Sequence, residues 1–330
     1  MKIAIAGNGG WGTALALMLN GYGHDVALWG AFPDYIDEMR RAGENVRYLP
    51  GVKLPPSLRL VADPAEAAAG AECVVIAAPS KYYASVCEKF RGVVGGGSLV
   101  VSVTKGFDEE RHCRMSTLAC DILGVGHVVV LSGPSHAEEV ARGLPTCVVA
   151  ACEDLVRAET VQKIFSGPFF RVYTGTDPLG AEIGGAVKNV IAVAVGVSDG
   201  MGFGDNSRAA LIARGLREMT RFGVALGARA DTFSGLSGIG DLVVTCTSRH
   251  SRNHAVGEKL GKGGKIADIT AGMQMVAEGV WNSHIVHEMA GSLDVEMPIC
   301  SLVHKFCDEG VSPRDAVQSL MGRGHKSEIL

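Results

Sequence analysis

The sequence predicts an α/β protein in which a doubly wound parallel sheet at the N-terminus is followed by an all-α domain. Three observations carry this prediction. The chain opens with a strand, a glycine-rich turn and a helix; short apolar runs then alternate with helical segments as far as residue 173; and the runs after residue 178 have only helical character. We therefore divide the 330 residues into a first domain over 1–176 and a second domain over 177–330.

The first element is an apolar strand over 2–6, and an apolar helix continues from Ala14. Between them, Gly7, Gly9 and Gly12 fit the pattern G-x-G-x-x-G. The first glycine permits a tight turn, the second lets the backbone approach a pyrophosphate, and the third lets the helix pack closely on the strand. Free N–H groups at the helix start then hold the anion. The motif in this setting indicates a Rossmann-like dinucleotide-binding domain rather than an ordinary glycine-rich turn.

Five further apolar runs follow, rich in Val, Ile and Leu, over 24–29, 72–78, 98–103, 127–132 and 146–151. Runs of this kind are typical of parallel strands that are covered by helices on both faces. Ligands of open parallel sheets bind beyond the carboxyl ends of the strands. We therefore expect the loops over 77–80 and 104–106 to face the cofactor.

The second half contains predicted helices over 181–196, 207–226, 254–260 and 276–290. The segment 236–252 contains many small residues and one acid, Asp241, which follows Gly238 and Gly240, and we predict that it is a loop.

Composition excludes several classes of protein. The net charge is −4, and no basic run with interleaved aromatic residues predicts a nucleic-acid partner. We find no apolar stretch of transmembrane length and expect no membrane span. Only a short apolar run separates the N-terminal Lys2 from the glycine motif, so we expect a strand there and not a signal peptide. Nine cysteines without a C-x-x-C pair indicate free thiols in a reducing cytoplasm rather than disulfides or a zinc site.

Lys188 stands in an apolar helical segment with no other charge between Glu182 and Asp199. Burying a lone ammonium group is costly unless the group is paired or neutralised. A helical lysine more often extends to the surface, but the isolation of this one favours a functional role. A desolvated lysine with a lowered pKa is a suitable general acid or base near neutral pH.

Three other polar features have alternative readings. Asp241 either orients a lysine or a hydroxyl group, or serves as a turn or N-cap residue. The segment 251–253 precedes a helix and suits a phosphate, although a capped helix with a surface arginine is the more common arrangement. The loop over 132–137 offers hydroxyl and N–H groups to a ligand, and we interpret its His136 as a bystander.

Taken in order, these segments resemble the NAD(P)-dependent glycerol-3-phosphate dehydrogenases of the bacterial type. The matching stretches are GNGGWGTALA at Gly7, TKGF at Thr104, SGPSHA at Ser132, GAVKNVIAVAVG at Gly185, AALIARGLREM at Ala209, LSGIGDLVVTC at Leu236, SRN at Ser251 and EMPI at Glu296. The resemblance covers almost the whole chain. It implies a reversible, NAD(P)H-dependent reduction of dihydroxyacetone phosphate to sn-glycerol 3-phosphate for phospholipid synthesis, in the cytoplasm, without a metal; a homodimer through the helical half is a further expectation.

The resemblance also implies roles for individual residues. The catalytic residues are Lys188 as general acid and base, with Lys105 and Asp241. The substrate-binding residues are Lys105, Gly133, Ser135, Lys188, Asp241, Ser251, Arg252 and Asn253. The cofactor-binding residues are Gly7, Gly9, Gly10, Trp11, Gly12, Lys105, Ala137, Arg252, Val276 and Glu278. We expect the cations Lys105 and Arg252, together with desolvation, to lower the pKa of Lys188, and Asp241 to oppose them.

The choice between NADH and NADPH depends on the residues after the second strand. Many relatives carry an arginine near the position of Ala31, where it can pair with a 2′-phosphate, and an acid there suits the ribose hydroxyls of NAD. This chain has neither, and Arg40 and Arg41 lie a helix away. We therefore expect NADH to be used at least comparably to NADPH.

Two other functions compete with this interpretation. Another dehydrogenase of the 3-hydroxyacid type has a similar architecture and is distinguished by a substrate without a phosphate. A non-catalytic NAD(P)-binding sensor is distinguished by cofactor binding without turnover.

Overall fold

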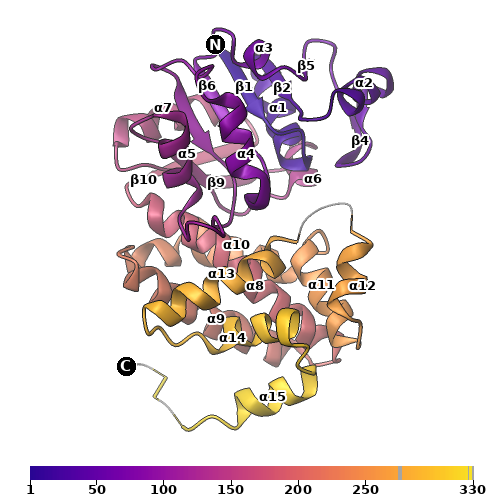
Figure 1. Ribbon diagram of the computed structural model, residues 1–330, viewed down its shortest axis with the longest axis vertical. Helices are drawn as coiled ribbons and strands as arrows, with labels where there is room; N and C mark the ends of the chain where they lie inside the picture. Colours follow the sequence, from indigo (N-terminus) through magenta and orange to yellow (C-terminus); the bar gives the residue numbers. More distant parts are fainter. Residues whose placement is uncertain (274–276, 326, 329–330) are drawn as a thin grey trace.

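The computed structural model describes residues 1–273, 277–325 and 327–328 of the chain. An α/β part formed by the first half lies against a helical part formed by the second half (Figure 1). The last strand ends at Gly175 and the first long helix of the helical part begins at Pro178. The architecture expected from the sequence, a doubly wound sheet followed by helices, is confirmed.

The α/β part is built on an eight-stranded sheet with the order β10-β9-β8-β7-β6-β1-β2-β5. Its strands are β1 Lys2–Ala6, β2 Asp25–Trp29, β5 Arg59–Val61, β6 Cys73–Ile76, β7 Leu99–Ser102, β8 Val129–Ser132, β9 Thr146–Ala151 and β10 Phe170–Gly175. A separate two-stranded sheet pairs β3 Glu44–Asn45 with β4 Leu49–Lys53. All six runs predicted as strands are strands in the structure.

Helices cover both faces of this sheet (Figure 1). They are α1 Gly10–Gly21, α2 Pro33–Ala42, α3 Pro64–Ala68, α4 Ser80–Phe90, α5 Met115–Leu123, α6 Ala137–Val140 and α7 Leu155–Phe165. Successive side chains of a strand point to opposite faces. In β1, Ile3 and Ile5 therefore join one core cluster while Ala4 and Ala6 join another, and both faces are buried. This double burial explains why the strands are apolar without alternation.

The prediction that all of these strands are parallel is wrong at β9. This strand runs antiparallel to β8, with Val130 opposite Ala151 and Ser132 opposite Val149. The connection between the two strands contains only the four-residue helix α6, whereas a parallel crossover normally needs a longer segment that traverses the sheet. Both strands are apolar, so composition does not reveal their relative direction.

The sequence analysis also missed both edge strands of the large sheet. The strand β5 has only three residues, and β10 alternates buried and exposed positions along its first four residues. Neither segment forms the continuous apolar run that marks the inner strands.

The helical part surrounds one central helix, α8 Pro178–Gly200. The other α-helices are α9 Asp205–Ala225, α10 Asp241–Thr247, α11 Arg252–Gly261, α12 Ile266–Ala271, α13 Glu278–Ser292, α14 Pro298–His304 and α15 Pro313–Met321. A 3₁₀ turn, η1 Ala230–Ser234, and two π-helical turns, η2 Leu236–Gly240 and η3 Lys305–Glu309, complete it.

Glycines allow α8 and α11 to pack at backbone distance. A Cβ atom added to Gly196 would lie 2.1 Å from the His254 carbonyl oxygen, and one added to Gly257 would lie 2.1 Å from the Val193 carbonyl oxygen. The start of α11 is thereby held against the middle of the central helix.

The central helix is long and apolar enough to cross a membrane, with a mean hydropathy of 1.4, so the expectation that no stretch reaches this length is wrong. All of the qualifying window is buried inside the protein, as in the core helix of a globular domain. It is the one such helix in the described residues, and its burial makes it weak evidence for a membrane span.

The predicted loop over 236–252 is also wrong for most of its length. The structure forms the π-helical turn η2 followed directly by α10, which begins at Asp241. The glycines of this segment suggested a loop, but the segment packs closely on the central helix: a Cβ atom on Gly184 of α8 would lie 2.2 Å from the Ser237 carbonyl oxygen. Close packing on the central helix therefore overrides the local preference for a turn.

Candidate active site

The site is centred on Lys188, which α8 places in the interior with 6% of its surface exposed. Its Nζ atom donates hydrogen bonds to Asp241 Oδ1 at 2.6 Å and to Thr245 Oγ1 at 2.7 Å. Asp241 and Thr245 stand four residues apart on α10, so the helix presents both to the same ammonium group. Of the two readings of Asp241, the structure therefore supports the one that orients a lysine.

A second lysine approaches the same carboxylate from the α/β part. Lys105, in the loop after β7, donates to Asp241 Oδ2 at 2.8 Å and to the Gly133 carbonyl oxygen at 3.0 Å. Two ammonium groups thus share one buried carboxylate, and this cluster carries a net charge of +1 when both lysines are protonated. A buried excess cation favours an anionic ligand.

Burial is the main reason for the lowered pKa of Lys188, which falls to about 8. Asp241 opposes this effect and raises the pKa, and Lys105 lowers it further. The sequence analysis named Lys105 and Arg252 first and gave desolvation a contributing role; the structure reverses that order. Burial raises the pKa of Glu278, and the hydrogen bonds from Ser80 and the charge of Arg252 oppose that rise.

The loop after β8 lines the same region. Gly133 has φ +137°, and a Cβ atom there would lie 3.0 Å from the Val148 Cα atom. Its carbonyl oxygen accepts hydrogen bonds from Lys105 and from the Ser135 hydroxyl, the latter at 2.9 Å. His136 follows, and its pKa is lowered by burial and then by the charges of Lys188 and Lys105. Its Nε2 atom is buried with no hydrogen-bond partner among the described residues.

The segment 251–253 begins α11. The Ser251 hydroxyl accepts a hydrogen bond from the His254 N–H group at 3.2 Å and so caps the helix, while Arg252 is exposed. Asn253 is buried; it donates to Asn189 Oδ1 at 2.8 Å and accepts from the Gly279 N–H group at 2.9 Å. These bonds place Asn253 beside Asn189, the neighbour of Lys188 on the central helix.

Glu278, at the start of α13, connects the helical part to the loop over 77–80. Its carboxylate accepts hydrogen bonds from the Ser80 N–H group at 3.0 Å and from the Ser80 hydroxyl at 2.5 Å. Asn282, one turn later, donates to the same carboxylate and accepts from the Phe107 N–H group. The predicted cofactor contact Val276 lies outside the described residues.

The glycine-rich turn has the shape that a dinucleotide requires. Gly7 has φ +130°, and a Cβ atom there would lie 2.5 Å from the Ala77 carbonyl oxygen; one on Gly12 would lie 1.9 Å from the Gly7 carbonyl oxygen. A Cβ atom on Gly9 would meet no described atom within 4 Å. The described first turn of α1 also has neither a capping side chain nor an acid, so its N–H groups are available to a pyrophosphate.

The other predicted residues of the turn lie close to this position. A Cβ atom on Gly10 would lie 3.7 Å from the Ala137 Cβ atom, so two predicted cofactor contacts are neighbours. The Trp11 ring lies 6.5 Å from the Phe170 ring. The backbone shape of the turn therefore fits a dinucleotide such as NAD(P).

The segment after β2 carries Ala31 at the position where an arginine could hold a 2′-phosphate. Two arginines that follow it in the sequence, Arg40 and Arg47, contact other residues. The guanidinium of Arg47 lies 4.2 Å above the Tyr35 ring and pairs with Glu38 at 2.6 Å. Arg40 is paired with Asp37 and donates to the Leu60 carbonyl oxygen. Both arginines thus already have partners.

The structure brings most of the predicted residues together in three groups. Lys105, Gly133, Ser135, Lys188 and Asp241 form the first, Arg252 with Glu278 forms the second, and Gly7, Gly9, Gly10, Gly12 and Ala137 form the third. Sequence reasoning missed Thr245 and Asn189. A helical interpretation of 241–247 would have placed Thr245 on the face of Asp241.

Comparison with known proteins agrees with this geometry. Family models described as the N-terminus and the C-terminus of NAD-dependent glycerol-3-phosphate dehydrogenase match residues 2–158 and 177–318. The chain is 46% identical over 331 residues to a glycerol-3-phosphate dehydrogenase [NAD(P)+] of Chlorobium phaeobacteroides, covering 99% of both chains. A relative of that name from Desulfitobacterium hafniense is 45% identical over 99% of this chain and 93% of its own. The crystal structure of a glycerol-3-phosphate dehydrogenase from Coxiella burnetii superposes with a TM-score of 0.94 and 38% identity, covering 98% of this chain and 99% of that chain.

Proposed function

The chain belongs to the family of NAD-dependent glycerol-3-phosphate dehydrogenases and is an NAD(P)-dependent oxidoreductase, and from this premise we propose that Lys188 is the residue that exchanges a proton with the substrate oxygen. The observation that carries the proposal is the buried ammonium group of Lys188, with a pKa of about 8, held by Asp241. A group that titrates near the working pH is suited to give and take a proton.

The reaction needs positive charge where the carbonyl oxygen of dihydroxyacetone phosphate becomes an alkoxide. The reduced nicotinamide, when bound, supplies the hydride to the carbonyl carbon. Lys188 donates its proton to the oxygen as negative charge grows there, and Lys105 stabilises that charge. Asp241 holds both ammonium groups at fixed distances, and Thr245 fixes Lys188 from a second side. In the reverse direction, neutral Lys188 accepts the hydroxyl proton.

We propose that the start of α11 holds the substrate phosphate. This helix has ten residues, and the exposed Arg252 stands at its first position. N–H groups at a helix start and a guanidinium are the donors that phosphates prefer. Gly133, Ser135 and Asn253 complete the substrate contacts. Binding of the phosphate then positions the carbonyl group for reaction.

We propose that the cofactor lies on the glycine-rich turn, with Gly7, Gly9, Gly10, Trp11 and Gly12 around the pyrophosphate. Contacts from Lys105, Ala137, Arg252, Val276 and Glu278 extend this site. The division of the chain at 176–177 separates this binding unit from the helical, catalytic unit.

The enzyme's setting follows from the same premise. We propose that it works in the cytoplasm, where it supplies sn-glycerol 3-phosphate for phospholipids; nine free cysteines suit a reducing compartment. A homodimer through the helical half stays a prediction, which sedimentation equilibrium checks.

The test is the reduction of dihydroxyacetone phosphate, followed at the nicotinamide absorbance with NADH and NADPH side by side. Lys188→Ala should abolish measurable turnover while NADH binding, followed by fluorescence, is retained. The exposed Lys89→Ala is the matched control and should behave as the wild type. Unchanged turnover in Lys188→Ala would remove Lys188 from the mechanism. Cofactor binding without turnover in the wild type would favour a sensor, and turnover of substrates without a phosphate would favour a 3-hydroxyacid dehydrogenase.

A further inference from the structure

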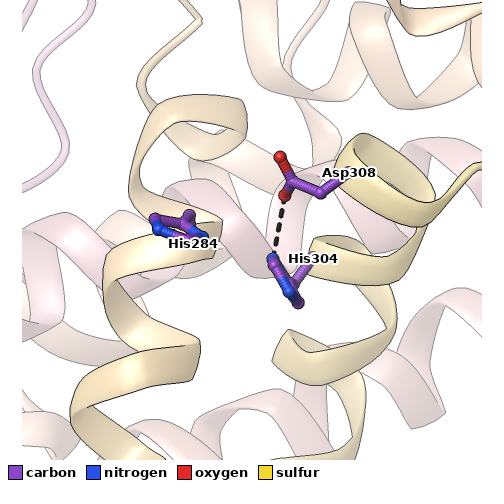
Figure 2. Close-up of side chains that lie close together, drawn as sticks. All are labelled: His284, His304 and Asp308. Carbon is purple, nitrogen blue, oxygen red and sulfur yellow. Dashed lines mark ion pairs between the residues drawn. The ribbon is translucent and has the colours of Figure 1, made fainter.

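A cluster of metal-ligating side chains lies in the helical part, and the mechanism above does not use it. It consists of His284 on α13, His304 at the end of α14 and Asp308 on η3. One potential ligand atom from each residue lies within 4.8 Å of the other two. Figure 2 shows His284 on one helix facing the gap beside His304 and Asp308 on the neighbouring segment. We propose that these three side chains form a binding site for a divalent transition-metal ion of the zinc type.

The strongest observation is the environment of His304. Its Nδ1 atom is buried and lies 2.8 Å from Asp308 Oδ2, but the two atoms do not meet at a hydrogen-bonding angle. Within the part of the chain that the structure describes, this nitrogen has no hydrogen-bond partner. The 2.8 Å contact with Asp308 is an ion pair when the imidazole is protonated (Figure 2), but without hydrogen-bond geometry it leaves the buried nitrogen poorly satisfied. A cation bound by both the nitrogen and the carboxylate would satisfy the two atoms together.

Neighbouring residues fix the orientation of both imidazole rings. The His287 ring stacks on the His304 ring, with centroids 4.3 Å apart and planes inclined by 14°. Glu288 Oε1 lies 3.3 Å from His284 Nε2, and Glu288 Oε2 lies 3.1 Å from His112 Nε2. Histidines that ligate metals commonly have a carboxylate beside the second ring nitrogen. Glu288 contacts Nε2 of His284, which leaves Nδ1 of that ring as the nitrogen for an ion.

The two segments present these groups through helical spacing. His284, His287 and Glu288 fall on one face of α13 because they are three and four residues apart. His304 and Asp308 are four residues apart, and Asp308 lies on a π-helical turn, a feature frequent at functional sites. A bound ion would therefore tie α13 to η3.

The donor set selects the class of metal. Two imidazoles and one carboxylate suit Zn²⁺ and its neighbours in the first transition row, whereas Ca²⁺ and Mg²⁺ prefer oxygen alone. Three protein ligands leave one position of a tetrahedral ion for water. The side chains of His284 and Asp308 are 41% and 48% exposed, so the ion can enter from solvent.

The experiment is a titration of the full-length protein with ZnCl₂ by calorimetry, after chelator treatment and dialysis. We expect one Zn²⁺ per chain that is lost or weakened at least about tenfold in His304→Ala and in Asp308→Asn, since even outer partners of metal ligands contribute this much. Glu288→Gln should weaken binding to a smaller extent. His127→Ala, an exposed histidine of the α/β part, is the matched control and should bind as the wild type does.

Two further measurements keep the proposal falsifiable if His304→Ala does not fold. Asp308 is half exposed, so Asp308→Asn should keep the wild-type circular dichroism spectrum. Co²⁺ added to the wild type should give the visible absorption of a tetrahedral ion, and the band should be lost in Asp308→Asn. Equal Zn²⁺ binding by the wild type and Asp308→Asn, or no binding by the wild type, would overturn the proposal.

Discussion

The shared carboxylate of Asp241 provides the sharpest test of the site. Asp241→Asn conserves volume but removes the negative charge that lies 2.6 Å from Lys188 Nζ and 2.8 Å from Lys105 Nζ. In the wild type this charge raises the pKa of Lys188 against burial and against Lys105, and the pKa is about 8. Removing it leaves two ammonium groups in contact. The pKa of Lys188 must therefore fall.

The size of the fall follows from the geometry. An opposite charge in direct contact shifts a pKa by about 1–3 units. At pH 7.5 a lysine with a pKa of 8 is about three-quarters protonated, and after a fall of one unit it is about one-quarter protonated. Because reduction needs the protonated form of Lys188, kcat/KM at this pH should fall at least about threefold from this cause alone.

The assay is kcat/KM for dihydroxyacetone phosphate from pH 6 to pH 9 at saturating NADH. In the wild type it should decline as the pH rises through about 8, where Lys188 loses its proton. In Asp241→Asn the decline should move to lower pH by at least about one unit. Thr245→Val is the matched control: it removes a neutral partner of Lys188 and should move the decline less. A decline that stays in place in Asp241→Asn, or moves to higher pH, would refute the reasoning.

Three other predictions concern the cofactor site and the stability of the fold. Gly12→Ala should abolish NADH binding and lower the free energy of unfolding by about 3 kcal/mol, because its Cβ atom would lie 1.9 Å from the Gly7 carbonyl oxygen; NADH fluorescence and urea melts measure both, and normal binding would contradict the proposed position of the pyrophosphate. NADH and NADPH should differ by less than about tenfold in kcat/KM, ~1.4 kcal/mol, because Arg40 and Arg47 already have partners; a larger preference for NADPH would show that another residue holds the 2′-phosphate. Burial raises the pKa of Glu218 to about 7, so its stabilising contribution is complete below pH 4.5 and is lost as the pH rises through 7. Glu218→Gln should therefore gain stability relative to the wild type between pH 5 and pH 8, by up to about 3 kcal/mol, and urea melts that show no such trend would contradict this.

Some features could be predicted from the sequence because they depend on neighbouring residues. The turn after β1 needs Gly7 because the backbone there has φ +130°, and it needs Gly12 because a side chain there would collide with the Gly7 carbonyl oxygen, five residues away. The inner strands are recognisable because burial on both faces leaves a continuous apolar run. Lys188 could be recognised as a candidate functional residue because a single charged side chain in an apolar helix is costly to bury, and such a cost is typical of a functional group.

Other features depend on segments that are distant in the sequence and become visible only in the folded chain. The direction of β9 is set by how the chain returns after β8, and α10 forms because 236–247 packs on the central helix. Asp241 is 53 residues from Lys188 and 136 residues from Lys105, so no local pattern reveals that the three groups meet. The glycine-rich turn and the importance of Lys188 could be read from the residues alone, because steric fit and charge act locally. Only the folded chain decided the lysine's burial and charge partners, because these depend on which distant segments are packed around it.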